Sequence, residues 1–140
     1  MIERLSPNKT QRTKPIRVIV LHCDGSPNEE ATLSWTDATK SKVSYTILIG
    51  RDGTCYRITE NNQRAWAVGI GEWRGKKDVN GISLNLAFSN KNDGKEPLTE
   101  AQIQAAKMVI LAWRHGYPDI EEVTTHKIVS RYEDGAYLHN

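Results

Sequence analysis

The sequence predicts one α/β domain in which a central mixed β-sheet is flanked by helices. Three observations predict this class: β-rich runs are mixed with helical segments, two of the runs form a hairpin signal, and one long amphipathic helix stands out. The 140 residues are enough for one core and too few for two ordinary domains. We divide the chain into a basic arm, residues 1–15, and a domain, residues 16–140.

The N-terminal arm is basic and has no apolar h-region. It carries Arg4, Lys9, Arg12 and Lys14 against Glu3 alone. We interpret it either as a solvated arm or as an arm that is attracted to an anionic surface. Without a secretory signal, the protein is expected to be made in the cytoplasm and to need another route for any export. No apolar run approaches the roughly 20 residues of a membrane span.

The first half of the domain shows three strand patterns and a short helix. Residues 17–23, "RVIVLHC", form a nearly continuous apolar run that is typical of a strand buried on both faces. Ser26 or Asn28 is placed to cap a helix that runs to about Lys40. "VSYTILIG" and "TCYRIT" then predict a hairpin, because Gly53 between them supplies the positive φ of a tight turn. Cys23 and Cys55 are expected to be buried free thiols.

The second half of the domain contains the clearest helix. Residues 60–79 have no clear period and are predicted to be a long functional loop, and residues 82–89 alternate like a central strand. Thr99 and Gln102 form a capping box, and Gly116 is expected to end the helix at C′. Its apolar stripe consists of Ile103, Ala106, Ile110 and Trp113. "EEVTTHK", residues 121–127, predicts a last short strand.

Two histidines end predicted strands, where open α/β sheets collect their ligands. His22 ends the first strand and His126 ends the last, and Asp134 follows in a loop that can fold back over the same edge. Two neutral imidazoles and a carboxylate suit Zn²⁺ and leave a fourth position for water. Spacing alone leaves a second interpretation open, in which each histidine is a structural residue.

Five stretches of the sequence, in order, resemble the zinc-dependent N-acetylmuramoyl-L-alanine amidases, a superfamily that includes phage amidase-type lysozymes and peptidoglycan-recognition proteins. "SYTILIGRDGTCYRI" resembles the family's "SYHYLIDRDGTVYQL", and "QRAWAVGIGEWRG" resembles "RAWHAGVSSWRG". The other three are "VIVLHCDGS", "DVNGISLNLAFSN", and "LTEAQIQAAKMVILAW" followed by "TTHKIVSRYEDG". The resemblance covers about residues 16–135.

The resemblance implies a zinc centre held by His22, His126 and Asp134. It implies that Tyr45 is catalytic through a hydrogen bond to zinc-bound water or to the developing oxyanion. The general base is left open between Tyr45 and Asp134. The family often has an oxyanion-stabilising lysine in the last loop, and Arg131 is the expected source of positive charge here because Tyr132 occupies the aligned position.

The chain departs from the family pattern elsewhere. Thr46 and Ala67 replace frequent histidines, and Asn85 replaces a frequent glutamate. The expected substrate-binding residues are Trp66, Trp73, Arg74, Asn85 and Tyr132. For each tryptophan, a ring that anchors the core or the loop is an equally good interpretation. Arg74 is open to a blander interpretation as part of a solvated charge run.

The function implied by the resemblance is hydrolysis of the amide between N-acetylmuramic acid and L-alanine in peptidoglycan. Among such enzymes, a small single-domain chain is most like a phage endolysin, made in the host cytoplasm and acting on the wall after release. We expect a monomer, with the basic arm drawn to the anionic envelope. The alternative is a non-catalytic peptidoglycan-recognition module. A nucleic-acid-binding domain is disfavoured because the net charge is only +2 and no base-stacking motif is present.

Overall fold

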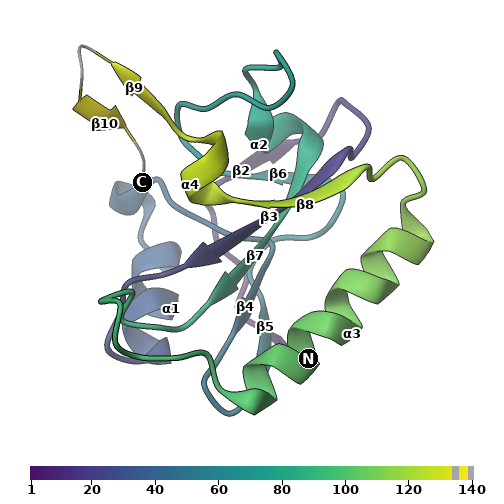
Figure 1. The fold of residues 1–140 in the computed structure, drawn as a ribbon. Coiled ribbons are helices and arrows are strands. Elements are labelled where there is room, and N and C mark those ends of the chain that lie inside the picture. Colours follow the sequence, from purple (N-terminus) through teal and green to yellow (C-terminus); the bar gives the residue numbers. More distant parts are fainter. Residues whose placement is uncertain (134–135, 139–140) are drawn as a thin grey trace.

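The protein, seen here as a computed structural model, is described for residues 1–133 and 136–138 (Figure 1). Its strands are β1 (Ile2–Glu3), β2 (Lys9–Gln11), β3 (Val18–Cys23), β4 (Ile47–Ile49), β5 (Cys55–Arg57), β6 (Gln63–Ala65), β7 (Ser83–Phe88), β8 (Glu122–Thr125), β9 (Arg131–Glu133) and β10 (Ala136–Leu138). Its helices are α1 (Glu29–Asp37), η1 (Thr39–Ser41, a 3₁₀ turn), α2 (Val79–Ile82), α3 (Glu100–Gly116) and α4 (His126–Val129).

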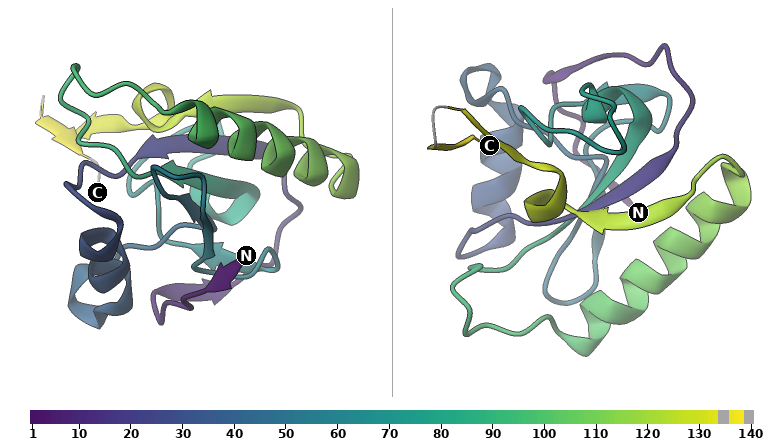
Figure 2. Two further views of the ribbon diagram at one scale, coloured as in Figure 1. Left: turned by 90° about the horizontal axis from the view of Figure 1, so that it is seen from below. Right: turned by 45° about the horizontal axis from the view of Figure 1, so that its top comes forward.

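The central sheet is mixed, as the sequence predicts, and its strand order is β1-β5-β4-β7-β3-β8. Only the β4–β5 hairpin is antiparallel, and the other neighbours run parallel. Helix α3 covers one face of the sheet, while α1 and α2 lie on the other (Figure 2). The parallel strands β3, β7 and β8 therefore end at one common edge.

Helix α3 covers a face on which the strands present apolar side chains. Alternate residues of β3, β4 and β7 point toward it and pack with Ala106 and Trp113 of the helix. The buried strand residues of this cluster are Ile19, Ile47, Ile49, Leu84, Leu86 and Phe88. The helix begins with the predicted capping box, in which Thr99 and Gln102 each accept a backbone hydrogen bond from the other. It includes Gly116 and has its C-cap at Tyr117, so it ends later than expected.

The opposite face of the same strands is part apolar and part polar. Val18 and Val20 pack with Trp73 and Val79, and Leu48 packs beside Ala87 and Tyr45 in a second cluster. Between these clusters lie three buried polar side chains that we call the polar strip: Ser83, Asn85 and His22. Alternation along residues 45–49 predicts that Tyr45 shares a face with Ile47 and Ile49. This prediction is wrong: Tyr45 packs in the cluster of Leu48, because β4 begins only at Ile47.

Residues 1–15 pack on the domain instead of forming a solvated arm. Strand β1 pairs with β5 in the main sheet, and β2 pairs with β6, which lies within the predicted long loop. The buried Asn8 amide donates to the carbonyls of Thr36, Ala38 and Val43. The Arg12 guanidinium donates to four backbone carbonyls, those of Asn61, Gln63, Gly81 and Ser83.

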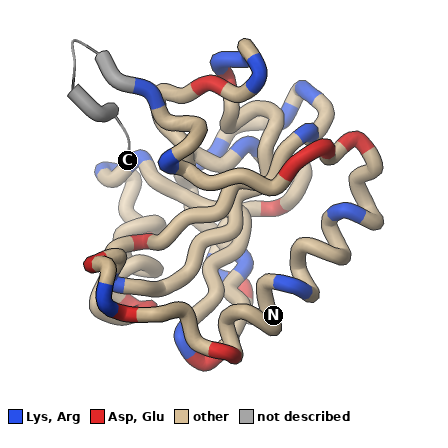
Figure 3. Tube along the Cα trace, in the orientation of Figure 1, with Lys and Arg blue, Asp and Glu red and all other residues tan. Residues whose placement is uncertain are grey.

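Surface charge and cysteine exposure can be compared with the sequence-based expectations. Lys and Arg are distributed around the whole trace, so positive charge is not confined to the N-terminal segment (Figure 3). Cys23 and Cys55 are free thiols, but Cys23 is exposed and Cys55 is only partly buried. Within the described part of the chain, no helix combines the length and the apolarity needed to cross a bilayer.

Candidate functional site

The two predicted histidines meet at the carboxyl edge of the sheet. His22 lies near the end of β3, and His126 follows directly after β8, which pairs in parallel with β3. The centroids of the two imidazole rings are 4.9 Å apart. The expectation that the histidines share one edge is confirmed, and parallel pairing of their strands is the reason.

His22 is held by the polar strip. Its ring is 5% exposed, and its Nε2 lies 2.9 Å from the amide oxygen of Asn85. An amide oxygen only accepts, so Nε2 carries the proton and the lone pair of the ring is on Nδ1. Burial, followed by the proximity of His126, lowers the pKa of His22 to about 3. His22 is therefore a neutral imidazole near pH 7, the form that binds metal ions.

His126 is held by the main chain of the loop of residues 60–79. Its Nε2 lies 3.0 Å from the carbonyl oxygen of Val68, which again requires Nε2 to donate and places the lone pair on Nδ1. The side-chain oxygen of Asn80 accepts from the backbone N–H groups of Ala67 and Val68 and fixes this segment. A Cβ added at Gly71 would lie 2.7 Å from the carbonyl oxygen of Val129, so only glycine allows the loop to pack this closely on α4.

The two histidines fit a metal ion such as Zn²⁺. Each is tied at Nε2 by an acceptor oxygen, which is the usual way in which a ligating histidine is oriented. The third predicted ligand, Asp134, lies outside the described residues. Within residues 1–133 and 136–138, no group of three His, Cys, Asp or Glu is placed to hold a metal ion. The fit of this site to a metal therefore rests on the histidine pair.

Tyr45 lies beside the histidines, as expected for a catalytic residue. Its ring centroid is 5.2 Å from that of His22. Burial, followed by the charge of Asp24 and by Cys23, raises the pKa of the Tyr45 hydroxyl above its usual value. The hydroxyl stays protonated near pH 7 and is suited to donate a hydrogen bond, whereas it is a poor general base.

Arg131 is not brought to the histidines. Its side chain is exposed, and Nη1 donates to the carbonyl oxygens of Ile128 and Ser130 at 3.0 Å each. Its other terminal nitrogen lies 3.9 Å from the carboxylate of Glu72. These contacts hold the guanidinium along the end of α4, so the structure does not support it as the oxyanion cation. Tyr132 lies in β9, and its side chain is outside the described residues.

Trp73 and Arg74 anchor the loop rather than line the site. Trp73 is 4% exposed, and its indole N–H donates to Glu122 at 3.1 Å. Arg74 stacks on the Trp73 ring at 4.6 Å and pairs with Glu121 and Glu122. Of the two interpretations left open for Trp73, the structure favours the anchoring ring. Trp66 is partly buried next to the Ala67–Val68 segment and remains a candidate for substrate contact.

Asn85 was expected to contact substrate, and the structure corrects this. Its side chain is 0% exposed, and its amide lies between His22 and Ser83. Asn85 therefore contacts His22, through a hydrogen bond at Nε2, rather than substrate. The signal in the sequence was a polar residue on the alternating pattern of a central strand, where an unpaired amide is costly to bury.

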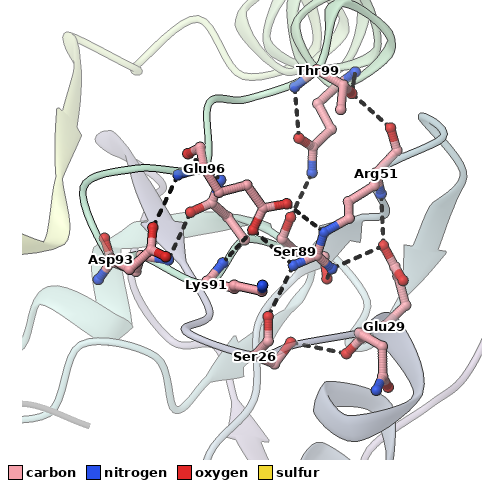
Figure 4. Close-up of polar contacts among 12 residues, drawn as sticks. Ser26, Glu29, Arg51, Ser89, Lys91, Asp93, Glu96 and Thr99 are labelled. Atoms are coloured by element: carbon pink, nitrogen blue, oxygen red, sulfur yellow. Dashed lines mark hydrogen bonds and ion pairs between the residues drawn. The ribbon is translucent and has the colours of Figure 1, made fainter.

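A second polar network fastens the loops that leave the sheet at this edge (Figure 4). The Arg51 guanidinium, at the hairpin turn, donates to both carboxylate oxygens of Glu96, to the Ser89 hydroxyl and to the carbonyl of Ser26. Thr99, the cap of α3, donates to the Arg51 carbonyl at 2.6 Å. One arginine thus connects the segments that follow β3, β4 and β7. From the sequence alone, Arg51 is predicted only to be part of the hairpin turn.

Comparison with known proteins finds matches that cover most of this chain. The family model described as N-acetylmuramoyl-L-alanine amidase matches residues 12–136. The 1,6-anhydro-N-acetylmuramyl-L-alanine amidase AmpD of Escherichia coli is 28% identical over 103 residues, which cover 72% of this chain and 54% of that protein. The match thus spans about half the length of this relative.

Solved structures share the fold at low identity. A selenomethionine derivative of AmpD superposes with a TM-score of 0.79 at 23% identity, covering 96% of this chain and 87% of that one. AmpDh3 of Pseudomonas aeruginosa, solved with anhydromuramic pentapeptide, has a TM-score of 0.74 at 22% identity and covers 87% and 55%. The Ph2119 endolysin of a Thermus scotoductus bacteriophage has a TM-score of 0.63 at 20% identity and covers 90% and 84%, so the likeness to this endolysin is no stronger.

Proposed function

Because this chain belongs to the N-acetylmuramoyl-L-alanine amidase family, we propose that it hydrolyses the amide bond between N-acetylmuramic acid and L-alanine in peptidoglycan. The observation that carries the proposal is the pair of neighbouring imidazoles, each donating its Nε2–H to an acceptor oxygen. Relatives such as AmpDh3 bind a muramyl peptide, which supports the same substrate class here.

The family is typically zinc-dependent, and we propose that His22, His126 and Asp134 hold Zn²⁺ in this chain. When bound, the ion would polarise the scissile carbonyl and lower the pKa of a water ligand toward about 7. The protein's part is to present two neutral imidazoles in one tautomer and to keep their rings from turning. His22 needs the buried polar strip for this, and His126 needs the Val68 carbonyl.

Tyr45 is the proposed donor to the oxyanion. Its raised pKa keeps the hydroxyl proton in place, and its ring lies against His22. Asn85 is buried and its amide does not take up a proton, so it does not serve as the base. Of the two base candidates considered from the sequence, Asp134 therefore remains the proposed one. Trp66 is proposed to contact the sugar or the stem peptide.

The activity is tested by comparing His126→Ala with His115→Ala. Both replace a histidine, but His115 is exposed near the end of α3 and takes no part in the site. Zinc content and release of peptide from a muramoyl-peptide substrate are measured for each. We expect His126→Ala to lose both and His115→Ala to keep both. Full activity of His126→Ala would contradict the assigned site. Stoichiometric zinc in the unmodified protein without any product would favour the non-catalytic recognition module.

The endolysin role is a finer proposal about the physical form of the substrate. An endolysin made in the host cytoplasm and released at lysis must cut the polymeric wall, whereas an enzyme of fragment turnover acts on soluble muramyl peptides. Purified sacculi and a soluble anhydromuramyl peptide distinguish the two roles. Solubilisation of sacculi at a rate comparable with cleavage of the fragment is the expected result for an endolysin. Cleavage of the soluble fragment alone would contradict that role and leave the amidase proposal intact.

A further inference from the structure

The side chain of Asn85 connects the polar strip into one chain of hydrogen bonds. Its Nδ2 donates to the Ser83 hydroxyl at 3.0 Å, and its Oδ1 lies 2.9 Å from His22 Nε2. Asn85 and Ser83 are 0% exposed, and His22 is 5% exposed. No substrate reaches the amide in this arrangement, so any effect of Asn85 on the reaction passes through His22.

We propose that Asn85 is a positioning residue that holds His22 in the tautomer protonated at Nε2 and thereby presents Nδ1 to the metal ion. This rests on the zinc centre put forward under the proposed function. A neutral imidazole exists in two tautomers, and the partner of one nitrogen decides which of them is populated. The acceptor oxygen behind His22 makes this choice before any metal binds.

The backbone fixes where the Asn85 amide points. Ser83 and Asn85 are two residues apart on β7 and therefore share a face, and Ala87, the next residue on that face, is the register partner of His22. The main chain of Asn85 is also tied to Thr46, because its N–H donates to the Thr46 hydroxyl and its carbonyl accepts from the Thr46 N–H, each at 2.9 Å. The amide therefore approaches His22 from a rigid strand.

The two histidines are oriented by acceptors of different kinds. His126 donates to a main-chain carbonyl, which no substitution of Val68 removes, whereas His22 donates to a side chain that can be replaced. An amide oxygen also differs from a carboxylate in that it accepts the hydrogen bond from Nε2–H without adding a negative charge near the metal ion. The position thus supplies orientation and no proton transfer.

The test compares Asn85→Leu and Asn85→Asp in the zinc-loaded protein. Leucine removes the acceptor, and aspartate keeps an oxygen acceptor of nearly the same shape. Zinc affinity is measured by competition with a chelator, and the Nε2–H of His22 is observed directly by ¹H–¹⁵N NMR of the imidazole. Gln102→Leu serves as the matched control, because Gln102 is another fully buried amide, but one that bonds only to the main chain on the opposite face.

We expect Asn85→Leu to weaken zinc binding by about 10–100-fold and to lose the protected Nε2–H signal of His22. Asn85→Asp should stay within a few-fold of the unmodified protein and keep the signal. Gln102→Leu should lose stability without any change in zinc affinity. If Asn85→Leu does not fold, Asn85→Asp alone tests the inference. Loss of zinc binding and of the Nε2–H signal, although an oxygen acceptor is kept, would then overturn it.

Three results separate failure of this inference from failure of the proposed function. If Asn85→Leu binds zinc as tightly as the unmodified protein and keeps the Nε2–H signal, the inference is overturned and the zinc centre stands. Loss of zinc by Asn85→Asp equal to that of Asn85→Leu would also overturn it, because the acceptor oxygen would then not be what His22 needs. If the unmodified protein binds no zinc, the proposed metal centre itself fails.

Discussion

The two faces of the central sheet are built from the same strands, but one forms the core under α3 and the other carries the candidate site. Toward α3, alternate residues of β3, β4 and β7 are aliphatic or aromatic, and the buried Gln102 amide of α3 bonds there to main-chain carbonyls. On the opposite face, β3 and β7 present the polar strip and end at the histidine pair. Alternation thus lets one strand of 6 residues, such as β3 or β7, contribute to a core and to a site at once.

The two faces also differ in how they respond to substitutions. An apolar face loses stability in proportion to the volume removed, whereas a buried polar chain requires each of its members to keep a partner. In the polar strip, His22 depends on Asn85, and Asn85 in turn bonds to Ser83. Changes on the α3 face should therefore alter stability, and changes on the site face should alter metal binding first.

The largest stability effect is expected on the α3 face. Trp113→Ala should lower the free energy of unfolding by about 3–5 kcal/mol, because the ring is 4% exposed and nothing replaces its volume. Urea denaturation measures the loss, and zinc competition on the folded fraction should show unchanged affinity. A large change in zinc affinity would show that the two faces are not independent.

Deletion of residues 1–11 should cost on the order of 3 kcal/mol, because it removes two strands and several buried hydrogen bonds of about 1 kcal/mol each. The lost groups include Ser6 and Asn8, both buried under η1 and α1. Thermal unfolding measures the effect. A truncated protein of unchanged stability, with weaker action on whole cells only, would support the basic-arm interpretation instead.

Gly71→Ala should act on the site face. The new Cβ would meet Val129 O at 2.7 Å and Val68 Cγ1 at 2.8 Å, so the loop must move away from α4. We expect a stability loss of about 1–3 kcal/mol. A drop in zinc affinity should accompany it, because the Val68 carbonyl orients His126. Gly116→Ala, in open space near the end of α3, is the control and should change stability by less than about 1 kcal/mol. Equal zinc affinity in both variants would exclude a role for loop position.

The smallest effect concerns pH and the Arg51 network. Hydrogen bonds from Arg51, and then from the Lys91 N–H, lower the pKa of Glu96 to about 2. A depressed carboxyl pKa stabilises the fold above the unfolded value of about 4.5, and this stabilisation is lost as pH falls through about 2. The stability difference between the unmodified protein and Arg51→Ala should therefore shrink on acidification across that window, as followed by denaturant titrations. A difference that is constant with pH would rule out this linkage.

The elements predicted from sequence were those whose signals are local. The strand of residues 18–23, the hairpin around Gly53 and the capped helix α3 depend on periodicity and turn chemistry within a few residues. The packing of residues 1–15 was missed because Asn8 and Arg12 bond to carbonyls remote in the chain, which no local pattern encodes.

The candidate site divides in the same way. His22 and His126 could be placed because each ends a strand pattern, and the structure brings them together. For Trp73 and Arg74 two interpretations stayed open, because a loop sequence does not show which of its rings will be buried against a neighbouring strand. The acceptors behind the histidines, Asn85 and the Val68 carbonyl, belong to other segments and emerge only when the sheet is assembled.

The edge position of β8 has a consequence for when the histidine pair can form. Among the described residues, this strand pairs with β3 alone, and His126 follows at its end. A growing polypeptide that has not yet emerged beyond residue 126 holds one imidazole of the pair and lacks the other. The histidine pair therefore forms only after the chain has been synthesised past residue 126 and β8 has paired with β3.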